Sequence, residues 1–217
     1  MKKDLTELVF IIDRSGSMSG LESDTIGGYN AMLEKQKKEQ GEAVITTVLF
    51  DDKYELLHDR INIRGVEPIT EKDYFVRGST ALLDAVGKTI NKIGRVQKHT
   101  ADNERAEKVM FVITTDGMEN ASREFTREKI REMITHQKVK YGWEFIFLGA
   151  NIDSAETAES FGIGRDMAAD YNADSEGTRL NYEVISQTVS DLRARRAISK
   201  EWKERIDEDR EKRGEKR

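Results

Sequence analysis

The stretch FIIDRSGSMSG, residues 10–20, joins an apolar run to a short polar turn that contains two glycines. The run, ELVFII (7–12), is almost continuously apolar and rich in β-branched and aromatic residues, which is typical of a strand buried on both faces of a sheet. Directly after it come the carboxylate of Asp13 and the hydroxyls of Ser15 and Ser17, at alternate positions. The stretch therefore predicts a buried strand that carries polar side chains to one edge of a sheet.

The remaining strands and helices are predicted from similar patterns along the chain. Further apolar runs of the same character lie at 43–50, 108–115 and 143–150. Helical spacing of apolar residues occupies 21–40, 80–97, 125–141 and 176–198. Residues 53–63 fit an antiparallel edge strand that pairs with 43–50, and a sixth strand is expected near 167–171.

Strands that alternate with helices of this length predict right-handed crossovers between parallel strands. The expected fold is α/β: a doubly wound, mostly parallel six-stranded sheet with helices on both faces and one antiparallel edge strand. Ligands of such sheets bind beyond the carboxyl ends of the strands. The turn at residues 13–20 lies at that end of the first strand, so its position suits a binding site.

Composition narrows the classes of function. The chain of 217 residues is 37% hydrophobic, long enough for one large domain, and its net charge of -5 argues against a nucleic acid partner. The absence of cysteine excludes disulfides, thiolate metal sites and a cysteine nucleophile. Three scattered histidines exclude a histidine-rich metal cage.

The beginning of the sequence, MKKDLTELVFIID, has two lysines but an apolar run shorter than the roughly 7–15 residues of a signal-peptide core. No stretch approaches the roughly 20 apolar residues that span a bilayer. We therefore expect a cytoplasmic protein that does not bind membranes. Residues 1–198 are expected to form the domain, and 199–217, almost wholly charged, a solvated C-terminal helix end or tail.

Two further polar positions are expected at the same sheet edge. Thr80, in RGSTALLDAV, stands in a glycine-containing loop before a helix, and Asp116, in VITTDGMEN, follows a buried strand directly. An Asp-x-Ser-x-Ser turn by itself is equally consistent with a helix N-cap and a tight turn. Three separated segments that supply oxygen ligands to one edge favour a site for a small cation instead.

Together these residues resemble the metal-ion-dependent adhesion site (MIDAS) of von Willebrand factor type A (vWA) domains. The resemblance covers roughly residues 5–195 and departs from the family pattern in Gly78-Ser79-Thr80, where Gly-Gly-Thr is more usual. It implies that Ser15, Ser17 and Thr80 bind the metal directly. It also implies that Asp13 and Asp116 act largely through water and orient the hydroxyls.

The function implied by the resemblance is metal-dependent protein binding without catalysis. The expected cofactor is Mg²⁺, with Mn²⁺ or Ca²⁺ as alternatives, and an open position on the ion would capture an acidic side chain of a partner protein. Intracellular members of the family often serve as assembly or regulatory adaptors. Two alternatives are a Mg²⁺-dependent phosphohydrolase and a module whose metal is purely structural. The phosphohydrolase lacks the second aspartate usual in dehalogenase-like enzymes, because position 15 is serine.

Two features outside the motif also give expectations. The paired glycines Gly27 and Gly28 predict close packing of a helix against a neighbour. Asp84, one helical turn after Thr80, either supports the metal shell or faces solvent, and the solvent-facing interpretation is favoured.

Overall fold

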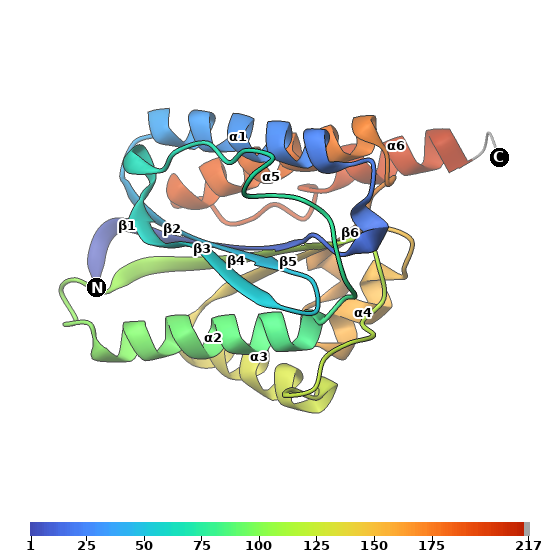
Figure 1. Cartoon of the computed structure of the whole chain (residues 1–217). Helices are drawn as coiled ribbons and strands as arrows, with labels where there is room; N and C mark the ends of the chain where they lie inside the picture. The colour runs from blue at the N-terminus through green and yellow to red at the C-terminus, as the bar shows by residue number, and fades with distance from the viewer. Residues whose placement is uncertain (215–217) are drawn as a thin grey trace.

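The computed structural model describes residues 1–214 and contains a six-stranded sheet between two layers of helices (Figure 1). The strand order is β3-β2-β1-β4-β5-β6, and among these strands β3 alone runs antiparallel to its neighbour. The strands are β1 (Lys2–Asp13), β2 (Glu42–Phe50), β3 (Tyr54–Asn62), β4 (Ala106–Thr115), β5 (Glu144–Gly149) and β6 (Ala168–Asp170). The predicted fold class is confirmed, including the antiparallel edge strand.

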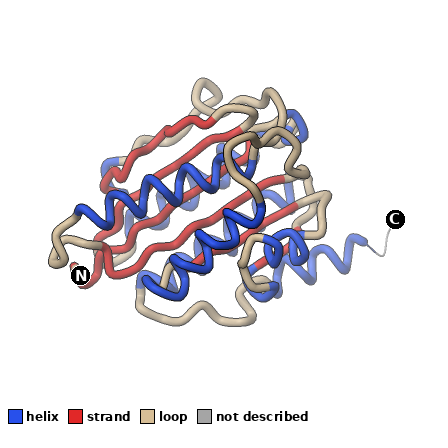
Figure 2. Tube along the Cα trace, turned by 90° about the horizontal axis from the view of Figure 1, so that it is seen from below, coloured by secondary structure: helices blue, strands red, loops and turns tan. Residues whose placement is uncertain are grey.

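Helices cover both faces of this sheet. Figure 1 shows α1, α5 and α6 on one face and α2, α3 and α4 on the other, and Figure 2 shows the helices lying along the strands. The helices are α1 (Glu22–Lys38), α2 (Leu82–His99), α3 (Arg127–Tyr141), α4 (Ser154–Ser160), α5 (Ser175–Arg193) and α6 (Glu204–Gly214). Within residues 1–214 no helix is both long enough and apolar enough to cross a bilayer.

The helix boundaries follow local capping chemistry. Thr126 caps α3 by accepting a hydrogen bond from the backbone N–H of Lys129. The final predicted helix, 176–198, ends earlier, at Arg193, because the chain turns at Arg195 with a φ of 61°. The short helix α4 was not predicted, and the side chain of Asp153 caps it.

The central strand β1 separates two apolar cores. Leu8, Phe10 and Ile12 face α1 and α5, whereas Val9 and Ile11 face α2 and α3, and all five are at most 1% exposed. This alternation explains why the run at 7–12 has no polar side. Burial on both faces fixes the strand, and therefore fixes where its carboxyl end emerges.

The paired glycines of α1 have different surroundings. A Cβ atom on Gly28 would lie 2.4 Å from Cδ2 of Tyr182 on α5, so close packing is confirmed there. A Cβ atom on Gly27 would meet open space, so the packing role predicted for Gly27 is wrong. The two positions are about 100° apart around the helix, and only one of them faces the partner helix.

The charged C-terminal segment forms a largely exposed helix, but one side of that helix packs against the domain. It forms α6, which packs beside β6 and α5, and Ile206 is only 2% exposed. Trp202 Nε1 donates to the carbonyl of Asp166 (2.8 Å), and Lys203 Nζ donates to the carbonyl of Ala168 (2.7 Å). Buried Ile206 and the polar contacts of the residues just before the helix therefore hold α6, which is otherwise charged, against the domain. Residues 215–217 of the expected tail lie outside the described residues.

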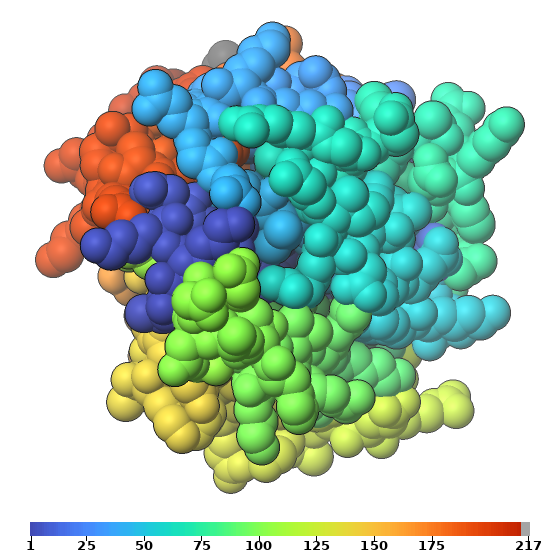
Figure 3. All heavy atoms as spheres, turned by 90° about the vertical axis from the view of Figure 1, so that its left-hand side faces the viewer, coloured from blue at the N-terminus to red at the C-terminus, as the bar shows by residue number. Residues whose placement is uncertain are grey.

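Figure 3 shows the surface of the molecule on the side away from the carboxyl ends of β1 and β4, where the N-terminal residues (blue) lie. There Arg195, just beyond α5, pairs with Asp4 (3.0 Å) and Glu107 (2.9 Å). These ion pairs lie at the amino end of the central strands, whereas the polar loops of the candidate site lie at the carboxyl end.

Candidate metal centre

The candidate site lies where β1 and β4 end side by side. The strands are parallel neighbours with Ile12 opposite Thr114, so Asp13 and Asp116 leave the sheet at the same edge. The chain continues from Asp13 into a short 3₁₀ turn, Gly16–Met18, and a third loop brings Thr80 from the segment before α2. The structure thus brings the three separated segments together, as the sequence predicts.

Three hydroxyl groups form the centre of the site. Ser15 Oγ lies 3.1 Å from Ser17 Oγ and accepts a hydrogen bond from Thr80 Oγ1 at 3.0 Å. A Cβ atom on Gly117 would lie 3.0 Å from Ser17 Oγ and 3.5 Å from Thr80 Oγ1. The turn after β4 therefore reaches the hydroxyls closely, and glycine at position 117 leaves room for that approach.

The side chain of Asp13 holds the serine turn that follows β1. Its carboxylate is fully buried and accepts hydrogen bonds from the Ser15 backbone (2.7 Å) and from Thr115 Oγ1 (2.5 Å). Burial raises the pKa of Asp13 to about 6, and the hydrogen bonds from Thr115 and Ser15 oppose that rise. Asp13 thus orients the serine turn, and Thr115, which sequence reasoning missed, orients Asp13.

Asp116 has a buried oxygen without a partner. The residue is 2% exposed, and its Oδ1 atom has no hydrogen-bond donor among the residues that the structure describes. Burial raises the pKa of Asp116, and the nearby hydroxyl of Ser17 opposes that rise. An unsatisfied buried carboxylate oxygen is costly unless a cation or an ordered water compensates it.

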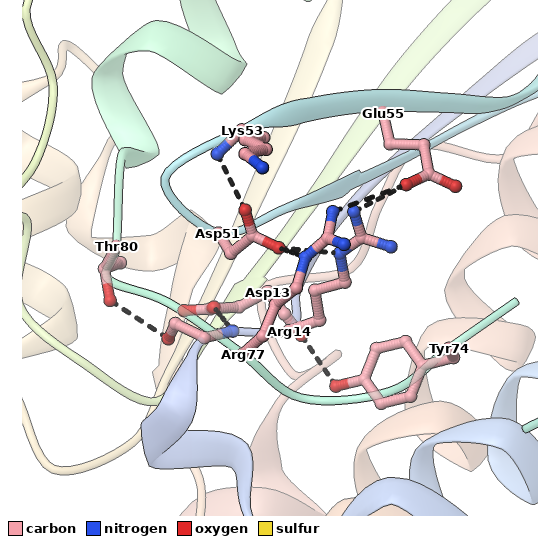
Figure 4. Close-up of polar contacts among 9 residues, drawn as sticks. Asp13, Arg14, Asp51, Lys53, Glu55, Tyr74, Arg77 and Thr80 are labelled. Atoms are coloured by element: carbon pink, nitrogen blue, oxygen red, sulfur yellow. Dashed lines mark hydrogen bonds and ion pairs between the residues drawn. The ribbon is translucent and has the colours of Figure 1, made fainter.

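Thr80 is fixed on both sides of its backbone. Its N–H donates to Asn120 Oδ1 (3.0 Å), and its carbonyl accepts from the backbone of Asn120 (3.0 Å) and Ala121 (3.2 Å). On the first loop, the hydroxyl of Tyr74 donates to the carbonyl of Asp13 at 2.7 Å (Figure 4). Asn120 and Tyr74 were missed because they lie 40 and 61 residues from their partners and no motif spacing marks them.

Asp84 does not have the solvent-facing role that its position favours. It is 8% exposed, so it does not face solvent, and its carboxylate accepts hydrogen bonds from three successive backbone N–H groups, Arg123, Glu124 and Phe125. The favoured solvent-facing interpretation is therefore wrong. Asp84 instead anchors the loop after β4 to the first turn of α2.

The donor set fits a hard divalent cation. Three neutral hydroxyls and two carboxylates supply oxygen, the ligand element that Mg²⁺, Mn²⁺ and Ca²⁺ prefer. Within residues 1–214 no group of three or more His, Cys, Asp or Glu side chains is placed to hold a metal. The oxygen donors grouped at this edge are therefore the hydroxyls of Ser15, Ser17 and Thr80 together with the carboxylates of Asp13 and Asp116.

Comparison with solved structures identifies the fold of the chain. No protein-family model and no curated protein sequence matches the chain. Proximal thread matrix protein 1 from the mussel byssus matches with a TM-score of 0.57 and 12% identity, over 86% of this chain and 46% of that chain. A von Willebrand factor type A protein from Catenulispora acidiphila gives 0.57 and 10%, over 85% and 42%. The chain has the vWA fold.

Metal-loaded proteins are among the similar structures. The manganese-loaded TRAP protein of Plasmodium vivax matches with a TM-score of 0.59 and 16% identity, over 83% of this chain and 72% of that chain. Another structure of the mussel protein has a zinc-occupied MIDAS motif and is 14% identical to this chain. The chain spans less than half the length of the mussel and Catenulispora proteins.

A groove of about 410 Å³ adjoins the hydroxyl cluster of this vWA fold. Its lining combines the site residues Ser17 and Asp116 with hydroxyl, amide and carboxylate groups. These are Ser19, Asn151, Asp174 and Ser175. Asn151 has a φ of 57° and donates to the carbonyl of Asp116 at 3.4 Å. The groove is therefore lined mainly by polar groups.

Proposed function

We propose that the chain is a metal-dependent protein-binding module. Ser15, Ser17 and Thr80 would hold a divalent cation directly, and Asp13 and Asp116 would orient them. The observation that carries the proposal is the hydroxyl cluster, with separations of 3.0 and 3.1 Å, beside the unpartnered Oδ1 of Asp116. We propose Mg²⁺ as the cation, with Mn²⁺ or Ca²⁺ as alternatives, because all three take oxygen ligands.

Neutral ligands matter for the recognition step. When bound, the cation would supply a positive centre that attracts an acidic side chain of a partner. Ser15, Ser17 and Thr80 contribute no charge, so they leave most of the positive charge available for that carboxylate. The polar groove beside Ser17 would take the segment of the partner that carries it.

The similar structures support a cation at this position. TRAP is described as manganese-loaded and the mussel protein as having a zinc-occupied MIDAS motif. Those are different proteins, and the chemistry of this chain's own oxygen atoms is the stronger support for a cation here.

We further propose that the module binds without catalysis and works in the cytoplasm as an adaptor or as an assembly or regulatory factor. The site offers hydroxyls and carboxylates, and position 15 holds a serine where a dehalogenase-like phosphatase would need its acid. Turnover of a generic phosphoester by the purified protein would overturn the non-catalytic part of this proposal.

Calorimetric titration with Mg²⁺ tests the metal site. Thr80→Ala removes one hydroxyl without adding charge or bulk, and it should weaken Mg²⁺ binding by roughly tenfold or more. Thr188→Ala is the matched control, because Thr188 is equally buried but bonds only to the carbonyl of Val184 on its own helix. If Thr80→Ala binds Mg²⁺ as tightly as the parent protein, the proposed site is wrong.

Partner capture needs a separate experiment. The parent protein and Thr80→Ala would be used as baits in native lysate, each with Mg²⁺ and with EDTA. A partner of the proposed kind is retained only by the parent in Mg²⁺, and it is lost when its critical Asp or Glu is changed to Ala. Partners that are retained equally in EDTA would contradict metal-dependent capture.

A further inference from the structure

Arg14, between two motif residues, points away from the hydroxyl cluster into the protein. Its side chain is fully buried, with Nε 3.0 Å from Asp51 Oδ2 and Nη2 2.6 Å from Glu55 Oε2 (Figure 4). Asp51 is also fully buried. A buried ion pair often stabilises a fold no better than apolar residues of the same volume, because desolvation of the charges offsets their attraction. Stability alone is therefore a weak explanation for this pair.

Asp51 connects three segments of the site edge. Besides Arg14, its carboxylate accepts hydrogen bonds from Arg77 Nε (2.7 Å) and from the Lys53 backbone (2.7 Å). Its backbone carbonyl accepts from the N–H of Ala81 at 2.9 Å. Asp51 thus holds the loop that carries Thr80 at two points, Arg77 on one side of Thr80 and Ala81 on the other.

The same loop is attached to the serine turn by its backbone. The N–H of Arg77 donates to the carbonyl of Arg14 (2.9 Å), and the N–H of Gly16 donates to the carbonyl of Gly78 (3.2 Å). Gly78 has a φ of 67°, and a Cβ atom there would lie within 3 Å of Asp52 Oδ1. The path of this loop is therefore tightly determined, and its end point is Thr80 Oγ1, 3.0 Å from Ser15 Oγ.

We propose that Asp51, held in place by Arg14 and Arg77, is a positioning residue for the metal centre, which holds Thr80 against Ser15 before a cation arrives. The inference rests on the proposed function, because the hydroxyls must bind a cation for their spacing to matter. The side chain of Asp51 does not contact the hydroxyl cluster, so it would act through Thr80. Preassembled hydroxyls spare the protein the cost of ordering a loop when the metal binds.

Mn²⁺ affinity, measured by electron paramagnetic resonance and calorimetry, tests the inference. Asp51→Asn should weaken Mn²⁺ binding by about tenfold or more, as loss of a group that orients metal ligands does elsewhere. Glu7→Gln is the matched control. Glu7 lies on β1, six residues before Asp13, and is as buried as Asp51. Its carboxylate also forms an ion pair, with Arg60 at 2.7 Å. Glu7→Gln should change urea stability but keep Mn²⁺ affinity within twofold.

A double variant separates positioning from a merely structural role. If Asp51 acts through Thr80, then Asp51→Asn should cause little further loss of Mn²⁺ affinity in a Thr80→Ala background. Arg77→Gln provides a milder perturbation should Asp51→Asn not fold, because Arg77 is 37% exposed, and it should weaken Mn²⁺ binding in the same Thr80-dependent way.

Each outcome of these measurements is decisive. If Asp51→Asn and Arg77→Gln bind Mn²⁺ within twofold of the parent while Thr80→Ala does not, the positioning role is refuted and the metal site stands. Full additivity of Asp51→Asn and Thr80→Ala would also refute it. If the parent itself binds neither Mn²⁺ nor Mg²⁺, the proposed function fails, and this inference fails with it.

Discussion

Substitution of the adjacent glycines of α1 should have opposite effects on stability. In Gly28→Ala, the new methyl group would lie 2.4 Å from Cδ2, 2.9 Å from Cγ and 3.1 Å from Cβ of Tyr182. These atoms lie where the Tyr182 side chain joins the backbone. Tyr182 is 7% exposed, and its ring packs edge-on against the ring of Tyr29, with 6.4 Å between the ring centroids. The ring cannot turn away at low cost, so α1 and α5 must separate slightly.

The magnitudes follow from two opposing terms. Alanine in place of glycine inside a helix gains about 1 kcal/mol from backbone propensity. Overpacking a filled contact costs typically about 1–3 kcal/mol. Gly27→Ala has the first term alone, because open space surrounds position 27, and it should stabilise the domain by about 1 kcal/mol. Gly28→Ala should be about 2 kcal/mol less stable than Gly27→Ala.

Urea unfolding followed by circular dichroism measures this difference directly. In a thermal melt, the same 2 kcal/mol corresponds to about 4–8 °C between the two variants for a domain of this size. Gly27→Ala is the matched control, since it carries the identical chemical change one position away on the same helix. Equal stability of the two variants would show that the α1–α5 contact is looser than the structure indicates.

Three further predictions concern regions outside the hydroxyl cluster. Truncation after Ser199 removes buried Ile206 and should lower the free energy of unfolding by about 2 kcal/mol or more, while Mg²⁺ affinity measured by calorimetry stays within twofold. Asp84→Ala leaves three backbone N–H groups without their acceptor and should cost about 2 kcal/mol in urea unfolding. Burial raises the pKa of Glu7 above its ordinary 4.5. The stability that Glu7 contributes is therefore lost as the pH rises from 4.5 through that higher pKa. Glu7→Gln should remove this decrease from the pH dependence of the free energy of unfolding, measured with urea.

The parts of the fold that the sequence predicts are those in which a run of neighbouring residues shows one hydrophobic pattern. The run at 7–12 is apolar at nearly every position because both faces of β1 are buried, and that pattern is visible without knowledge of its neighbours. The motif residues follow directly from the strand ends, because parallel neighbours deliver Asp13 and Asp116 to one edge. Local sequence and sheet geometry together are enough for this much.

The features that sequence missed depend on contacts between distant segments. Helix α4 is only seven residues long and has too few apolar positions to show a period. Helix α6 packs against the domain through Ile206 and a set of polar contacts, so its highly charged sequence gives no sign that it is packed. The role of Asp84 depends on backbone groups 39–41 residues away. None of these partnerships leaves a spacing that can be read along the chain.

The proposed function also follows from the balance of charge at the site. Without a cation, the edge presents the buried carboxylates of Asp13 and Asp116, and Asp174 lines the adjoining groove, so an acidic side chain from a partner would be repelled. The hydroxyls of Ser15 and Thr80 cannot reverse that field, because they carry no charge. A divalent cation held by them would offset the charge of the two buried carboxylates and attract the partner's acidic side chain to itself. If the site binds as proposed, capture of an acidic partner therefore depends on cation occupancy, and the local carboxylates make that dependence steeper than hydroxyl ligands alone would.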